Sequence, residues 1–156
     1  MAQVVLKHVT KKFEEKSIES VVAVDDFNLE IEEGECFSFL GPSGCGKTTT
    51  LRMIAGFVIP TSGSITIEGK DMTSVPVNER AIGFVFQNYA LFPHMTIYKN
   101  VGYGLKARGE KDADIHDKII NALKLVGLSG DENRYPNQLS GGEQQRVALA
   151  RVIVME

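Results

Sequence analysis

The chain has 156 residues, enough for one domain with a substantial core, and its 43% hydrophobic and 24% charged residues are ordinary for a globular protein. Its net charge of −3 argues against non-specific binding of nucleic acid. No apolar run approaches the roughly 20 residues of a membrane-spanning helix, and the N-terminus has no signal-peptide pattern. We therefore expect a cytoplasmic protein that reaches a membrane only through a partner.

The cysteines and histidines do not predict a metal site. Cys36 and Cys45 show neither a CxxC spacing nor a nearby pair of histidines. The three histidines, His8, His94 and His116, are scattered along the chain. A zinc site is therefore not expected.

The first half of the sequence predicts strands arranged around one helix. Residues 4–9 and 27–31 alternate apolar with polar side chains, as half-buried strands do, and a polar hairpin turn or loop separates them. Residues 36–40 form a short apolar run that ends at a glycine, which is typical of a buried strand. A helix is expected over residues 47–55, and residues 65–68 alternate again before a turn. The pattern predicts antiparallel strands wrapped around a βα unit.

The second half of the sequence is mainly helical. Residues 82–86 predict a second buried strand, and the helical pattern begins near Thr96. One helix should start at a cap formed by Asp112 or Asp114 and end at Gly127. Its apolar face consists of Ile115, Ile119, Ile120, Leu123 and Val126. A final helix is expected from about Gly141 into the C-terminus, and we interpret the helical part as an insertion on an α/β core.

The segment Gly41-Pro-Ser-Gly-Cys-Gly-Lys47-Thr48, here called the phosphate loop, fits the pattern G-x-x-x-x-G-K-[ST] between a strand and a helix. Its glycines let the backbone curl so that N–H groups point at phosphate oxygens, and the helix N-terminus adds positive potential. A plain glycine turn is the structural alternative, but chance matches occur only about once in several hundred chains of this length. The sequence therefore predicts a nucleotide held by Ser43, Gly44, Cys45, Gly46, Lys47, Thr48 and Thr49, with the Thr48 hydroxyl on Mg²⁺.

The segment Leu139-Ser-Gly-Gly-Glu143, here called the signature segment, precedes the final helix. Ser140 followed by Glu143 is a capping box, which explains these two residues in structural terms. The box does not explain Gly141 and Gly142, because glycine is a poor residue for a first helical turn. Two glycines there leave backbone N–H groups open to a close ligand. We therefore expect a second phosphate-reading site at Ser140, Gly141, Gly142 and Glu143.

The order GPSGCGKTT, then Gln87, then LSGGEQQRVALAR resembles the ATP-binding domains of ABC transporters over essentially the whole chain. The resemblance implies an α/β fold: a P-loop NTPase core, here incomplete, with an N-terminal antiparallel β subdomain and an inserted α-helical subdomain. It divides the chain into residues 1–94 (β subdomain and core), 95–140 (helical subdomain) and 141–156 (signature helix). It further implies an ATPase that binds ATP and Mg²⁺ and is coupled to solute transport.

The resemblance also implies roles for individual residues. Gln87 matches the glutamine that contacts Mg²⁺ and the attacking water, so it is a catalytic and metal-binding candidate with Thr48. Phe13 lies where the family has an aromatic ring stacked on adenine, although the usual residue is tyrosine and the segment after Phe13 is longer than usual. The signature segment closes over the γ-phosphate of an ATP that a second ATP-binding domain holds.

Residues 88–105, which follow Gln87, are similar to the same region of bacterial importer ATPases. The resemblance implies that this aromatic-rich stretch receives transmembrane permease subunits, which places the protein peripherally on the inner face of the cell membrane. In the family, a strand with an aspartate for Mg²⁺ and then a catalytic glutamate follow the signature helix. Glu156 does not match that glutamate because no strand precedes it. We therefore expect the chain by itself to be incompetent for hydrolysis.

Three alternatives share parts of this pattern. DNA-repair and chromosome-organising ATPases separate the two motifs by a long coiled coil, whereas about ninety residues without sustained heptads separate them here. ATPases that act on ribosomes carry paired cassettes, and the importer-like residues 88–105 argue against them more weakly. A nucleotide-binding module without enzymatic activity is the third alternative. The sequence favours transport, with no nucleic-acid partner.

Overall fold

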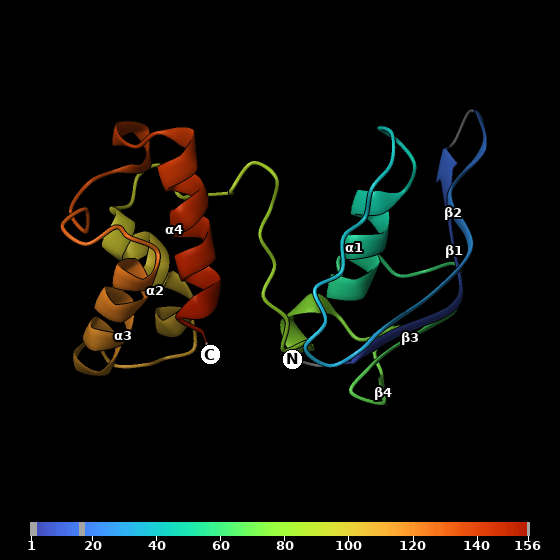
Figure 1. The fold of residues 1–156 in the computed structure, drawn as a ribbon, viewed down its shortest axis with the longest axis horizontal. Helices are drawn as coiled ribbons and strands as arrows, with labels where there is room; N and C mark the ends of the chain where they lie inside the picture. Colours follow the sequence, from blue (N-terminus) through green and yellow to red (C-terminus); the bar gives the residue numbers. More distant parts are fainter. Residues whose placement is uncertain (1–2, 16–17, 156) are drawn as a thin grey trace. The chain divides into compact units, whose positions relative to one another are not determined.

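The structure, a computed structural model, describes residues 3–15 and 18–155 of the chain. The chain divides into two units, Met1–Ile82 and Gly83–Glu156. The first unit contains the strands β1 to β4 and the helix α1, and the second contains the helices α2 to α4 (Figure 1). The predicted functional boundaries, after residues 94 and 140, stay a prediction. None of the described helices has the length and apolar character needed to cross a membrane.

An antiparallel sheet of order β2-β1-β3-β4 forms the first unit. Its strands are Val4–Glu15, Ile18–Ile31, Ser62–Ile67 and Lys70–Asp71. The predicted half-buried strands are confirmed, and the first two extend further because Glu15 pairs with Ile18. The predicted hairpin turn or loop between them includes residues 16 and 17, which lie outside the described residues.

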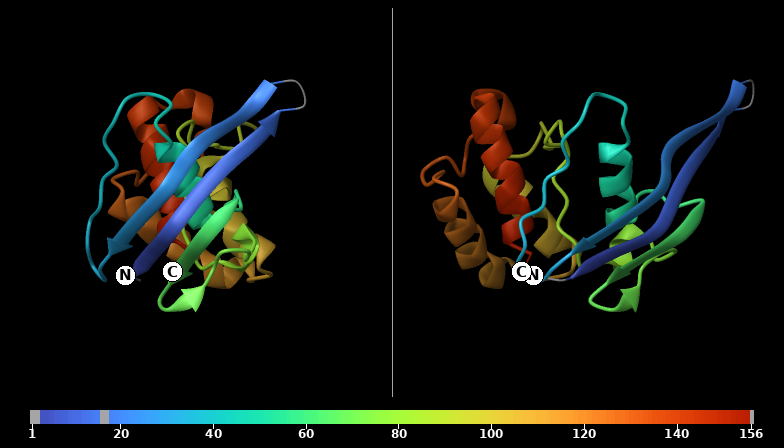
Figure 2. Two further views of the ribbon diagram at one scale, coloured as in Figure 1. Left: turned by 90° about the vertical axis from the view of Figure 1, so that its right-hand side faces the viewer. Right: turned by 45° about the vertical axis from the view of Figure 1, so that its right-hand side comes forward.

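The helix α1, Lys47–Ala55, has the same bounds as the predicted helix and lies beside the sheet in both views of Figure 2. Met53 of α1 is fully buried and packs into one core with side chains of β1, β2 and β3: Leu6, Val9, Val24 and Ile65. The helix ends at Gly56, whose left-handed φ of 85° is the usual way to stop a helix. This core fixes α1, and hence the phosphate loop that precedes it, against the sheet.

Arg80 holds the C-terminal end of α1. It follows a short 3-10 helix, Val77–Glu79, and its side chain is only 6% exposed. Its guanidinium donates hydrogen bonds to the carbonyl oxygens of Met53 (2.9 Å) and Ile54 (2.5 Å) near the end of the helix. It also donates to the carbonyls of Val75 (2.8 Å) and Met72. Burial lowers the pKa of this guanidinium, but an arginine remains charged in proteins.

Three helices and a short 3-10 helix form the second unit: α2 (Ile97–Ala107), α3 (Asp112–Leu125), the 3-10 helix Pro136–Gln138 and α4 (Gly141–Ile153). Their apolar faces meet in one core, to which α3 contributes the predicted residues Ile115, Ile119 and Leu123. The predicted cap of α3 is wrong. The N-cap position is Lys111, whose side chain makes no capping hydrogen bond, because the helix begins at residue 112 itself.

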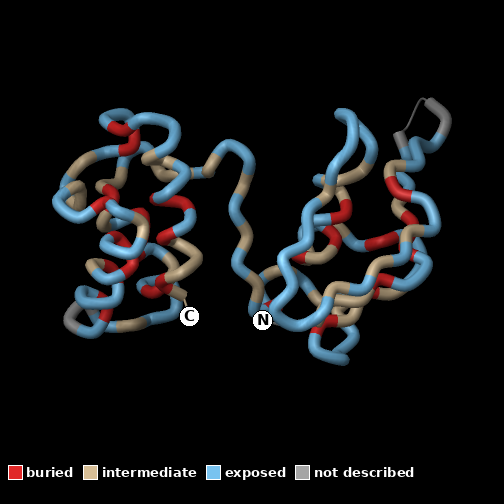
Figure 3. The backbone as a smooth tube through the Cα atoms, in the orientation of Figure 1, coloured by how far each residue is buried: buried red, intermediate tan, exposed pale blue. Residues whose placement is uncertain are grey.

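The two predicted buried strands are not strands in the described part of the chain. Residues 36–40 and 82–86 are extended but do not belong to the sheet. Residues 36–40 are largely exposed (Figure 3), and Leu40 is 93% exposed. The Phe39 ring nevertheless meets the Phe37 ring edge to face and lies at a tilt to the Phe27 ring. An apolar run indicates a segment that favours burial, but a strand also needs a neighbouring backbone to bond, and the local sequence does not supply one.

Candidate functional site

The phosphate loop leads into an uncapped helix. Gly46 is the N-cap of α1 and has a left-handed φ of 90°. A Cβ on Gly46 would lie 2.5 Å from the carbonyl oxygen of Ala23 in β2, so only glycine fits there. In α1, all of whose residues are described, no side chain caps the N-terminus and no first-turn residue is acidic. The first N–H groups of α1 are therefore open to an anion.

Lys47 places its charge over this loop. Its Nζ donates hydrogen bonds to the carbonyl oxygens of Gly41 (2.8 Å) and Pro42 (2.6 Å), and it lies 3.4 Å from Cys45 Sγ. The side chain thus curls back across the loop that it follows. The next residue, Thr48, is exposed, so its hydroxyl is available at the first turn of the helix. Thr50 is buried, and its hydroxyl donates to Gly46 O, which fastens the loop to the helix.

A hollow of about 440 Å³ adjoins the phosphate loop. Its walls come from residues 22–25 of β2, from the rings of Phe27 and Phe39, and from residues 44–47 of the loop. The volume lies within the range of about 300–1,000 Å³ that small-molecule sites occupy. The sequence did not indicate the part played by β2, because Ala23 of β2 and Gly46 of the loop are far apart in the sequence and meet only in the tertiary structure.

Phe13 lies in β1, where its ring is 41% exposed. Lys11 Nζ lies 5.1 Å from the ring centroid, within the range of a cation–π contact. Phe13 is not among the described residues that line the hollow. Its role in stacking on adenine stays a prediction.

The signature segment forms the predicted capping box. Ser140 is the N-cap of α4, and its N–H and its hydroxyl each donate to Glu143 Oε2 at 2.7 Å. The Glu143 N–H donates back to Ser140 Oγ at 3.4 Å. The hydrogen bonds from the Ser140 hydroxyl and N–H hold the pKa of the Glu143 carboxyl below its usual value. The structural reading of these two residues is therefore correct as far as it goes.

The glycines of the signature segment have no structural cause in the described part of the chain. Apart from its chain neighbours and the nearby backbone of α4, a Cβ added to Gly141 or Gly142 would meet no described heavy atom within 4 Å, and neither residue has a left-handed φ. Gly46 differs on both counts. This chain could therefore accommodate a Cβ at both signature positions, so the role expected of these glycines in reading a phosphate stays a prediction.

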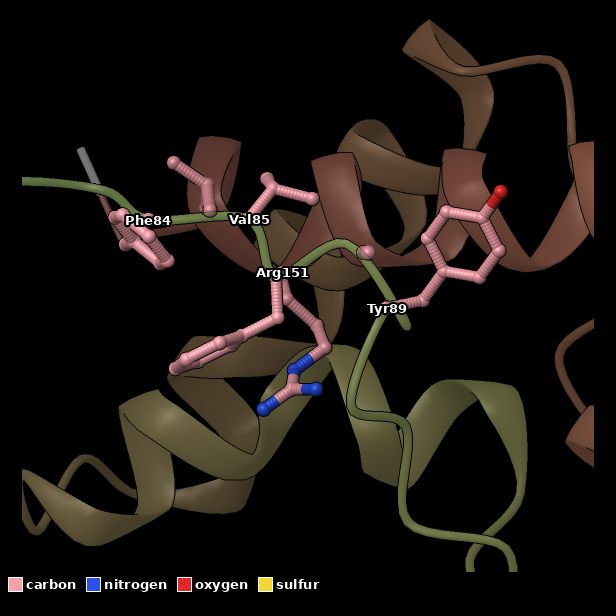
Figure 4. A pocket seen from close by; sticks show the side chains of 7 residues that line it. Phe84, Val85, Tyr89 and Arg151 are labelled. Atoms are coloured by element: carbon pink, nitrogen blue, oxygen red, sulfur yellow. The ribbon is translucent and has the colours of Figure 1, made fainter. Parts of the chain in front are cut away.

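Gln87 begins a tight turn in the second unit, over residues 87–90, and is exposed. The signature segment belongs to the same unit, whereas the phosphate loop belongs to the first. A pocket of about 120 Å³ flanks the Gln87 turn, between residues 84–89 and the α4 residues Ala148, Arg151 and Val152 (Figure 4). Sequence reasoning missed Arg151, and no local signal marks an arginine near a helix end as a wall of a pocket.

The histidines and cysteines do not gather. Within residues 3–15 and 18–155, no group of three or more His, Cys, Asp or Glu side chains is arranged to hold a metal ion. His8 Nδ1 lies 2.7 Å from Asp26 Oδ1, and His116 Nδ1 lies 3.2 Å from the Tyr98 hydroxyl. Two of the three histidines, His8 and His116, therefore each have a side-chain partner outside any metal site.

The chain resembles importer subunits over nearly its full length. FbpC 1 of Pectobacterium atrosepticum, an Fe(3+) ions import ATP-binding protein, is 50% identical over 151 residues, which cover 97% of this chain and 42% of that protein. PotA of Thermobifida fusca, a spermidine/putrescine import ATP-binding protein, is 54% identical over 150 residues, which cover 96% and 38%. The chain thus spans less than half the length of these curated relatives.

A solved structure agrees with this result. The dimeric ATP-binding cassette MJ0796, in a post-hydrolysis state bound to ADP and Pi, has 38% sequence identity and a TM-score of 0.85, over 96% of this chain and 68% of that chain. The likeness confirms the predicted α/β fold class. The family described as "ABC transporter" matches residues 24–156, which include the phosphate loop, Gln87 and the signature segment. The chain belongs to the ABC transporter family.

Proposed function

We propose that this chain is the ATP-binding part of an ABC importer subunit that couples ATP binding and hydrolysis to the uptake of a solute. The observation that carries the proposal is the open N-terminus of α1 beside a hollow of about 440 Å³. A left-handed glycine cap, an absent capping side chain and Lys47 Nζ above the loop together suit a triphosphate.

Each part of the phosphate loop would contact ATP in its own way. Residues 43–49 would supply backbone N–H groups, and Lys47 would exchange its two carbonyl acceptors for phosphate oxygens. The exposed hydroxyl of Thr48 fits a ligand of Mg²⁺, which when bound neutralises phosphate charge. Gln87 would complete the metal's surroundings and orient the attacking water, and Phe13 would stack on adenine. These roles follow from the family pattern and from the shape of the loop.

The signature segment would act on a nucleotide held by a second ATP-binding domain. Two glycines that the chain's own packing does not require support a group arriving from outside. The uncapped backbone of Gly141 and Gly142 is suited to a phosphate, with Ser140 and Glu143 shaping the turn around it. The dimeric form of the similar cassette MJ0796 supports such a pairing.

The further partners would be transmembrane permease subunits, which would hold this protein against the inner face of the cell membrane. Residues 88–105 would provide the contact, and similarity to named import subunits supports this arrangement. Relatives named for iron(III) and for spermidine or putrescine match this chain about equally well, at 50% and 54% identity. We infer that the solute is selected elsewhere in the transporter.

Titration with Mg-ATP tests the proposal. Lys47→Ala removes the charge above the loop and should weaken ATP binding by more than about tenfold, the scale of a lost charge-assisted hydrogen bond. Lys70→Ala, which removes an exposed lysine from the same unit, is the matched control and should bind as the wild type does. Equal affinity of the Lys47→Ala variant and the wild type would overturn the assignment of the site.

A further inference from the structure

The turn that follows Gln87 holds a strained backbone. Tyr89 and Ala90 have left-handed φ values of 61° and 46°, although neither is glycine. Within the turn, the Tyr89 N–H donates to Phe86 O (2.9 Å) and the Ala90 N–H donates to Asn88 O (2.7 Å). Two consecutive residues in this conformation persist only where the surrounding structure holds them. The contacts that hold the turn therefore decide where Gln87 lies.

Arg151 of α4 donates a hydrogen bond to this turn. Its Nη1 donates to the carbonyl oxygen of Ala90 at 2.7 Å, across 61 residues of sequence. Its guanidinium carbon lies 5.0 Å from the centroid of the Phe92 ring, so the charge also rests on an aromatic face. Figure 4 shows Arg151 reaching from α4 to the segment that bears Phe84, Val85 and Tyr89. One side chain thus binds both the strained residue and the residue two positions beyond it.

A second anchor, Asn100 of α2, holds the far end of the segment. Asn100 is fully buried, and its Oδ1 accepts from the Phe92 N–H at 2.8 Å. Its Nδ2 donates to the carbonyl oxygens of Phe92 (3.0 Å) and Met95 (3.1 Å). Phe92 is therefore fixed to α2 whether or not Arg151 is present. Only the stretch between Gln87 and Phe92 depends on the bond from α4.

We propose that Arg151 is a positioning residue, which ties the Gln87 turn to the helix that begins at the signature segment. The helix α4 is one uninterrupted element of 13 residues, with the signature at its first turn and Arg151 near its last. An α-helix of that length behaves as a rod of about 20 Å. Gln87 and the signature are thus held in fixed relation through Arg151. The relevance of this link to catalysis rests on the function proposed above.

Amide hydrogen exchange of the chain, measured without nucleotide, tests the link. Arg151→Met keeps the length of the side chain but removes its donors and its charge, so the Tyr89 and Ala90 amides should exchange at least tenfold faster. Amides of α2 and α3 should keep their protection because Asn100 and the helical core are untouched. Arg146→Met removes an exposed arginine from the same helix and should change neither amide. Unchanged exchange in Arg151→Met, or equal changes in both variants, would refute the proposal.

Arg151→Lys separates positioning from general support of the fold. An ammonium can bond the Ala90 carbonyl but lacks the planar group that also covers the Phe92 ring, so exchange should be intermediate between wild type and Arg151→Met. Arg151→Met could also speed the exchange of the α3 amides, which would point to a general loss of the fold. In that case, wild-type exchange rates at Tyr89 and Ala90 in Arg151→Lys would mean that Arg151 only supports the fold, and the proposal would be overturned. A wild type that fails to bind Mg-ATP would remove the proposed function, yet the exchange result would still stand or fall on its own.

Discussion

The helices α1 and α4 both begin at glycine-rich segments, but their N-termini are built in opposite ways. At α1, Gly46 is required by the chain itself, and no side chain satisfies the first N–H groups. At α4, Ser140 and Glu143 close a capping box, and the two glycines inside it are not required by any described neighbour. The N-terminus of α1 is left without a capping side chain, and its glycine is fixed by the fold. The N-terminus of α4 is capped, and its two glycines have room for a side chain.

The difference between the two N-termini implies that α1 is stabilised elsewhere along its length. An uncapped N-terminus is costly by about 1 kcal/mol relative to a capped one, so α1 needs support elsewhere. That support comes from its opposite end, where Arg80 binds carbonyl oxygens of the last turn and a cation is favoured by the helix dipole. The phosphate loop can remain open because the other end of the same helix is closed.

Removal of the Arg80 side chain should therefore lower the free energy of unfolding more than any other change at these two helices. Arg80→Ala leaves buried carbonyl oxygens of α1 without their donor and should lower the free energy of unfolding by about 3 kcal/mol. Arg52→Ala removes an exposed arginine from the last turn of the same helix and should cost no more than about 0.5 kcal/mol. Denaturant unfolding measures both values. Similar losses in the two variants would show that Arg80 does not provide the missing support.

Replacing a glycine by alanine should change the free energy of unfolding in opposite directions at the two helix N-termini. Gly46→Ala places a Cβ against Ala23 O at a left-handed φ and should cost about 2 kcal/mol of unfolding free energy. Gly142→Ala meets no described neighbour in a helical turn and should stabilise the chain by about 0.5 kcal/mol. The same denaturant experiment compares them. If Gly142→Ala lowered the free energy of unfolding, glycine at this position would be needed for the stability of the chain itself.

The smallest expected effect is the loss of stability at acidic pH through the capping box at α4. Because the folded-state pKa of the Glu143 carboxyl lies below its unfolded value, its contribution is present at neutral pH and is lost as pH falls through the acidic range. Glu143→Gln keeps the shape of the side chain but cannot titrate, so its thermal midpoint should fall less between neutral and acidic pH. Glu68→Gln, an exposed change in the first unit, should show the wild-type decline. If the thermal midpoints of the wild type and Glu143→Gln fell in parallel with pH, the capping box would not be the cause of the lowered pKa of Glu143.

Much of the local structure could be predicted because its causes lie within a few residues. The bounds of α1, the start of α4 at Gly141 and the buried face of α3 follow from helical periodicity, glycine and capping side chains. The capping box joins atoms three residues apart, and the phosphate loop lies entirely within residues 41–48. The family resemblance, which the comparisons confirm, rests on these same segments.

The remaining features were decided by tertiary structure, because each needs a partner that sequence spacing does not reveal. The apolar runs 36–40 and 82–86 favour burial, yet whether they become strands depends on a neighbouring backbone, and in the described chain they are not strands. Arg80 is buried because carbonyls 26 and 27 residues earlier receive it, and Arg151 reaches Ala90 from 61 residues away. The same holds for the glycines. Both helix N-termini are rich in glycine, and only the tertiary contact of Gly46 with Ala23 shows that the fold needs glycine at Gly46 and not at Gly141 or Gly142.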